Sequence, residues 1–180
     1  VCDCLRHGAK TGVTERYLGH YGPVTSVDLH PRKGPMDFSD LFLTSSTDWT
    51  IKLWSKKSPP NPIYTFEGGS DYIYDAKWSP QHPAVFASVD GTGSLDIWHL
   101  NEDAEMPRHK VQVSQHAMNR LRWSKDGKRI VTGNTHGQVY LYDVAQEVAM
   151  PGDREWEKFD ETLRELADSG SRAAAQAERS

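Results

Sequence analysis

Short runs in which apolar and polar residues alternate dominate the first 145 residues of the chain. In "TIKLW", Ile51 and Leu53 point to one face and Lys52 and Trp54 to the other, as they do in a strand. Helical repeats would need a period of about 3.6 residues, which these runs lack. The alternation therefore predicts β-structure. Comparable runs lie at 24–31, 41–48, 73–80, 84–90, 94–100, 118–125, 129–136 and 138–144.

These runs repeat along the chain at a nearly fixed interval. Trp98 follows Trp54 by 44 residues, and Tyr142 stands in the same setting 44 residues later. The runs at 24–31, 73–80 and 118–125 form a second series with similar spacing. A period of this length is typical of a propeller blade, which takes about 40–45 residues for four strands.

The spacing predicts where each blade begins and ends. One complete blade is expected at about 24–66 and another at about 73–113. Residues 1–6 and 13–18 look like the last two strands of a preceding blade. Because a closed ring has about 4–8 blades, we expect the chain to be the C-terminal part of a longer protein. A third blade is expected to supply only the strands near 118–123, 129–132 and 138–143.

The fold prediction is thus all-β: a partial propeller over 1–145 with two complete and two partial blades, followed by a short α-helix. The helix is expected within 146–170, with Asp153 as a possible cap, Gly170 as its end and a disordered tail at 171–180. Its apolar face either packs on the propeller or binds a partner. We favour packing, because an apolar stripe usually finds its own core first. The residues of this face are Trp156, Phe159, Leu163 and Leu166.

The polar residues around each repeat resemble the signature of the WD-repeat family. That signature is a His before the first strand, an Asp in a hairpin and a Trp near the end of the third strand. The resemblance implies a hydrogen-bonded group inside each blade, with a Ser or Thr of the second strand as a further member. In the first blade these residues are His20, Ser45 or Ser46, Asp48 and Trp54; in the second Ser88, Asp90 and Trp98, with Ser70 in place of the His; and in the third His116, Thr132 and Tyr142, with His136 in place of the Asp.

A His, a hydroxyl and an Asp could also indicate a hydrolase triad. We favour the structural interpretation, because the residues recur with the repeat and no nucleophile elbow accompanies them. The sequence predicts no catalytic residue, no metal site and no cofactor. Cys2 and Cys4 are read as free or buried thiols, since nothing nearby supplies the other ligands of a zinc site. Two cysteines so close together favour a reducing compartment.

Charge and hydropathy exclude some partners. The formal net charge is −4, which predicts no strong attraction to nucleic acid or membranes. No apolar run approaches the ~20 residues that span a bilayer. Two proline-containing segments, 31–40 and 56–62, are expected to be loops and are candidates for contacts with partners.

Three segments carry a closer resemblance, to the intermediate chains of cytoplasmic dynein. They are "RHGAKTG", "LFLTSSTDWTIKLW" and "DYIYDAKWSPQHPAVFASVDGTGSLDIWHLN". The resemblance runs from Val1 to about Leu166. It implies a non-catalytic scaffold subunit that docks on the heavy-chain tail of a minus-end-directed microtubule motor in the cytoplasm. Contacts with other dynein and dynactin subunits would use regions outside this chain, and contact with microtubules would be indirect.

Two other classes of function stay open at this point. One is a WD-repeat scaffold of another multiprotein assembly, whose blades would follow the same physics. The other is a propeller enzyme, which would need acidic residues or histidines facing the central channel. The innermost strands offer only Asp28 and Asp75 for such a role.

Overall fold

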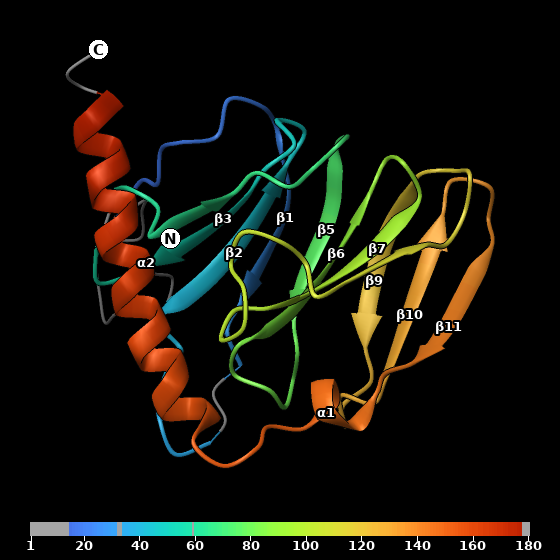
Figure 1. Cartoon of the computed structure of the whole chain (residues 1–180). Coiled ribbons are helices and arrows are strands. Elements are labelled where there is room, and N and C mark those ends of the chain that lie inside the picture. The colour runs from blue at the N-terminus through green and yellow to red at the C-terminus, as the bar shows by residue number, and fades with distance from the viewer. Residues whose placement is uncertain (1–14, 32–33, 59, 178–180) are drawn as a thin grey trace, which may run out of the picture.

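The computed structural model describes residues 15–31, 34–58 and 60–177 of the chain. Three antiparallel sheets stand side by side, and one long helix lies against the first of them (Figure 1). The predicted all-β partial propeller with a C-terminal helix is confirmed. The first sheet contains β1 (Val24–Leu29), β2 (Leu41–Ser46), β3 (Ile51–Ser55) and β4 (Tyr64–Phe66); the second β5 (Ile73–Trp78), β6 (Val85–Asp90), β7 (Ser94–His99) and β8 (His109–Gln112); the third β9 (Met118–Trp123), β10 (Arg129–Asn134) and β11 (Val139–Asp143).

The middle strands of the first two blades lie at the centre of the core. Every residue of β2, β3, β6 and β7 is buried. One apolar cluster joins the first and second blades, and another joins the second and third. The strands still alternate in sequence although both faces are buried, because polar side chains such as Lys52, Ser88 and Asp96 are buried in them as well.

The segment before the first blade differs from the prediction. The strand expected at 13–18 falls partly outside the described residues, and its described part, 15–18, is not a strand. Tyr17 instead packs edge-on against Phe42 and Trp54, with ring centroids 5.0 and 5.6 Å apart. This segment therefore covers the outer side of the first blade. Cys2, Cys4 and the strand expected at 1–6 lie outside the described residues.

The helical region consists of two helices rather than one. A short helix, α1 (Gln146–Ala149), ends at Met150, which is extended with φ −121° and ψ 130°. Pro151 is the physical reason, because a proline disfavours helical backbone in the residue before it. The long helix, α2 (Glu155–Ala177), starts after Arg154, which has a positive φ of 68°. Asp153 is therefore not adjacent to the helix and does not cap it.

The α2 helix packs on the first two blades. Phe159 is fully buried, with its ring 4.9 Å from that of Phe38 and 6.1 Å from that of Trp78. Leu166 is buried in the same cluster, and Trp156 and Leu163 pack against it. Phe38 belongs to the loop 34–40. This loop was a candidate for contacts with partners, and it forms part of the surface on which α2 packs.

The helix also runs past its predicted end at Gly170. There the backbone approaches the first blade so closely that a Cβ on Gly170 would lie 2.4 Å from the carbonyl oxygen of Ile63. The glycine is thus explained by close helix–blade contact and not by helix termination. Among the described residues, no helix is both long enough and apolar enough to cross a bilayer.

Candidate functional site

The first blade contains a chain of hydrogen bonds between buried side chains. Nε1 of Trp54 donates to Oγ1 of Thr44 across 2.8 Å. The same oxygen lies 2.7 Å from Nε2 of His20, and Nδ1 of His20 lies 2.8 Å from Oδ2 of Asp48. These hydrogen bonds therefore link the loop before β1 to the strands β2 and β3 and to the hairpin between them.

Elementary chemistry fixes the direction of each bond. An ionised carboxylate only accepts, so Nδ1 of His20 carries the proton and donates to Asp48. In the neutral ring Nε2 is then an acceptor, and the Thr44 hydroxyl donates to it while accepting from Trp54. Burial lowers the pKa of His20, which favours this neutral form. Burial opposes ionisation of Asp48, but hydrogen bonds from Thr50 and His20 together hold its pKa below the ordinary value.

The hydroxyl that takes part in this series of hydrogen bonds is not the one predicted from the sequence, Ser45 or Ser46. It belongs to Thr44, whereas Ser46 accepts a hydrogen bond from the N–H of Asp48 at 3.2 Å. Ser45 points to the other face and bonds Oγ1 of Thr25 at 2.8 Å. The spacing could have identified Thr44, because it stands ten residues before Trp54, as Ser88 does before Trp98.

The second blade keeps only part of this arrangement. Nε1 of Trp98 donates to Oγ of Ser88 across 3.2 Å. Asp90 does not join them; it accepts hydrogen bonds from the Thr92 hydroxyl at 2.6 Å and the Ser94 N–H at 3.0 Å within its own hairpin.

The position of the missing histidine in the second blade can also be located. A Cβ on Gly19 would lie 3.4 Å from Cη2 of Trp54, and one on Gly68 would lie 3.3 Å from Cη2 of Trp98. The residue after Gly19 is His20, so the equivalent position is Gly69 and not Ser70. A glycine there supplies no side chain to bridge Ser88 to the hairpin.

The group expected in the third blade does not form. Oγ1 of Thr132 is buried without a hydrogen-bond partner, and the ring of His116 stacks on that of His136 with centroids 3.5 Å apart. Asn134 organises the β10–β11 hairpin instead, because its Oδ1 accepts the N–H groups of His136 at 3.0 Å and Gln138 at 2.9 Å. Its Nδ2 also donates to Oγ of Ser114, before β9, across 3.1 Å. The structure therefore holds one complete hydrogen-bonded group, one partial group and one rearranged group.

The acidic residues of the innermost strands link neighbouring blades. Oδ2 of Asp28 accepts the N–H of Trp78 at 2.9 Å, and Oδ2 of Asp75 accepts the N–H of Leu121 at 3.1 Å. Nζ of Lys77 lies 3.5 Å from Asp28 and 3.3 Å from Asp75. Both carboxylates thus have structural partners across the blade interfaces.

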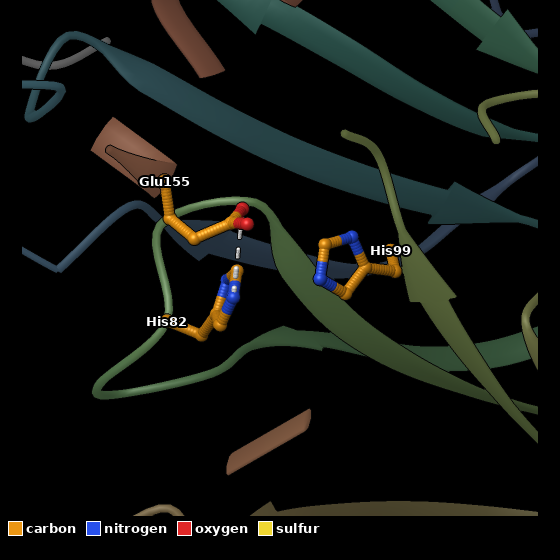
Figure 2. Close-up of side chains that lie close together, drawn as sticks. All are labelled: His82, His99 and Glu155. Atoms are coloured by element: carbon orange, nitrogen blue, oxygen red, sulfur yellow. Dashed lines mark ion pairs between the residues drawn. The ribbon is translucent and has the colours of Figure 1, made fainter. Parts of the chain in front are cut away.

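A polar cluster that sequence reasoning missed lies where α2 meets the second blade (Figure 2). Its members are His82 in the β5–β6 loop, His99 at the end of β7 and Glu155 at the start of α2. Nε2 of His82 lies 3.8 Å from Oε2 of Glu155, and the two imidazole centroids are 4.7 Å apart. Asn101 donates to the same carboxylate oxygen across 2.6 Å. The three residues are far apart in the sequence, so no spacing could have revealed the cluster.

The cluster fits a helix anchor better than a metal site. Its three ligand-type atoms lie within 4.8 Å of one another, as in a loose metal centre. However, Nδ1 of His82 accepts the N–H of Ala84 at 3.3 Å, so the neutral ring carries its proton on Nε2. A metal ion would need that same nitrogen without its proton. The Nε2–H instead faces Glu155, and Asn101 holds both the carboxylate and the Glu155 carbonyl.

The repeats match a known family along most of their length. The family described as "WD domain, G-beta repeat" matches residues 12–55, 60–98 and 107–143. The chain belongs to the WD-repeat family. In these terms the Trp54 group is the hydrogen-bonded group that the family signature implied, and the rearranged third repeat is a divergent WD repeat.

Two relatives show a closer likeness. The chain is 48% identical over 92% of its length to a cytoplasmic dynein 1 intermediate chain of Drosophila melanogaster. It is 34% identical over 72% of its length to a ciliary dynein intermediate chain 3 of Heliocidaris crassispina. The chain spans 25% and 21% of these two relatives, respectively. The resemblance to dynein intermediate chains is thereby confirmed.

Lowering the pH from 7 to 5 is expected to reduce the free energy of unfolding by about 2 kcal/mol through His82. Burial, aided by the nearby His99, lowers the pKa of His82 from 6.5 to about 4. The folded state then binds fewer protons than the unfolded state between these values, so stability falls as the pH drops through this window. Urea unfolding of the full-length protein at both pH values measures the effect.

A His82→Asn variant serves as the comparison, because an amide oxygen can still accept the Ala84 N–H. Its stability should fall less between pH 7 and 5. Asp96 acts in the opposite direction, since burial raises its pKa to about 6 and lower pH relieves the buried charge. Because Asp96 is present in both proteins, the difference between them reports His82. An identical pH dependence would contradict the assignment.

Proposed function

We propose that this chain is part of a non-catalytic scaffold subunit of the cytoplasmic dynein complex. Its propeller docks on the tail of the dynein heavy chain and so supports minus-end-directed transport along microtubules. The observation that carries the proposal is the 48% identity to a cytoplasmic dynein 1 intermediate chain across 92% of this chain. The subunit works in the cytoplasm, where it associates with microtubules through the motor and not directly.

The polar residues that could have formed a catalytic site make structural hydrogen bonds instead, which supports a scaffold role. The Thr44 hydroxyl lies between two buried rings, where no substrate carbonyl could reach it. Asp28 and Asp75, the innermost acids, bind backbone N–H groups of the next blade. These groups stabilise the propeller, and a propeller enzyme would need such residues free to face its channel.

The test is purification of the tagged full-length protein from its own cells. We expect the dynein heavy chain to co-purify in a stoichiometric amount and to remain bound after a salt wash. The purified subunit alone should hydrolyse no nucleotide, with the intact complex as the positive control. Recovery in another assembly without a heavy chain would favour the alternative, a WD-repeat scaffold of that assembly.

A further inference from the structure

Three exposed aromatic residues lie along one end of the first two blades. Because each sheet is an antiparallel meander, the β2–β3 hairpin and the β4–β5 connection emerge at the same end (Figure 1). These loops carry Trp49 and Tyr72, and the loop before β1 carries Tyr21. We call Tyr21, Trp49 and Tyr72 the aromatic rim.

Direct contacts hold the loops of the rim together. The N–H of Tyr21 donates to Oδ2 of Asp48 across 2.9 Å, which places Tyr21 beside the Trp49 hairpin. A Cβ on Gly69 would lie 2.3 Å from the carbonyl oxygen of Trp49, so the β4–β5 connection packs on that hairpin. The N–H of Gly91 donates to the carbonyl of Tyr72 across 2.9 Å. The loops that carry the aromatic rim are therefore joined to one another, or to a neighbouring hairpin, by hydrogen bonds and close packing.

The three side chains of the aromatic rim are far more exposed to solvent than the aromatic side chains of the core. Tyr21 is 97% exposed, Trp49 50% and Tyr72 46%, whereas Trp54 is 2% exposed. Trp49 also has a φ of 72°, a conformation that a bulky residue rarely adopts. Glycine or asparagine would fit this turn with less strain. Exposed Trp and Tyr are the residue types that most often dominate protein–protein interfaces.

The charged residues in the loops of the aromatic rim are acidic, and the buried Lys52 of β3 lies close enough to Asp48 and Glu67 to interact with both. The loops at 19–23, 47–50, 67–72 and 91–93 contain no Lys and no Arg. They contain three acidic residues: Asp48, Glu67 and Asp71. The carboxylate of Asp48 is nearly buried and already accepts hydrogen bonds from His20, Tyr21 and Thr50. Glu67 and Asp71 are therefore the acidic residues of these loops that a partner can reach. The loops at the opposite end carry charges of both signs, including Lys56, Lys57, Lys125 and Lys128.

We propose that the aromatic rim, with Glu67 and Asp71, binds a basic segment of a partner protein. Guanidinium groups stack on Trp and Tyr faces and pair with carboxylates, so arginine satisfies both features of the surface. A phosphate-bearing partner is disfavoured, because the same carboxylates repel it. The inference goes beyond heavy-chain docking and does not depend on it.

The test uses the full-length protein and two short fluorescein-labelled peptides in fluorescence anisotropy. One peptide alternates arginine with glycine, and the other alternates glutamate with glycine. We expect the arginine peptide to bind at least about tenfold more tightly, which corresponds to about 1.4 kcal/mol. Trp49→Asn, which suits the positive φ, and Tyr21→Ser should each weaken that binding several-fold without changing the melting temperature.

Two control variants keep the test specific. Asp126→Asn removes an acidic residue from the opposite end of the third blade, and Met106→Asn removes an exposed apolar residue from the β7–β8 loop at that same opposite end. Both should bind the arginine peptide as the wild type does. Equal binding of the two peptides, or an effect of Asp126→Asn as large as that of Trp49→Asn, would overturn the proposal. So would a wild-type affinity in both rim variants. A heavy-chain pull-down measured in parallel reports separately on the proposed function.

Discussion

Removal of residues 151–180 is expected to lower the free energy of unfolding of the full-length protein by roughly 5 kcal/mol. The truncation exposes the apolar surface that Phe159 and Leu166 cover, together with the side chains of Phe38 and Trp78. Phe159→Ala alone should cost about 3–5 kcal/mol, because it leaves a cavity inside that cluster. Urea unfolding followed by tryptophan fluorescence measures both changes.

A matched variant and a binding assay separate packing from partner binding. Glu165→Ala changes an exposed residue of the same helix and should leave stability nearly unchanged. If α2 served mainly to bind the heavy chain, truncation would abolish the heavy-chain pull-down and leave the unfolding curve unchanged. That result would reverse the assignment of the helix to the propeller.

Trp54→Ala is expected to cost about 3–5 kcal/mol in the full-length protein, and Trp98→Ala a similar amount. Both indoles are buried, and each donates its N–H to a hydroxyl of the second strand. Tyr142→Phe should cost less than about 0.5 kcal/mol, since the hydroxyl it removes has no partner among the described residues. Denaturant unfolding of the three variants gives the comparison.

Thr44→Val isolates the hydrogen-bonded chain from the burial of the indole. It keeps the shape of the side chain but leaves the Trp54 N–H and Nε2 of His20 unpaired, which should cost about 1–3 kcal/mol. Ser46→Ala, two residues along the same strand, should cost clearly less. Equal losses at Trp54, Trp98 and Tyr142, or at Thr44 and Ser46, would contradict a graded set of blade networks.

The strands were predictable because each blade repeats one pattern. The predicted blades at 24–66 and 73–113 match β1 to β4 and β5 to β8 within a residue or two. The predicted strands of the third blade match β9, β10 and β11 as closely. Alternation by two and a fixed repeat are local signals, and they survive even where the polar residues of a blade have diverged.

The side-chain network was less predictable, because its geometry depends on strand register. Thr44 and Ser46 lie on the same face of β2, and only the pairing of Phe42 with Trp54 brings Thr44 under the indole. The end of α2 was missed for a similar reason. A glycine in a sequence can mark a helix end or a close contact, and Gly170 is explained by the Ile63 carbonyl, which is more than a hundred residues away.

The placement of α2 has a consequence for local opening of the propeller. Since Phe159 contacts both Phe38 of the first blade and Trp78 of the second, these two blades cannot separate without releasing the helix. Amides of both blades and of the buried half of α2 should therefore exchange with solvent as one cooperative unit.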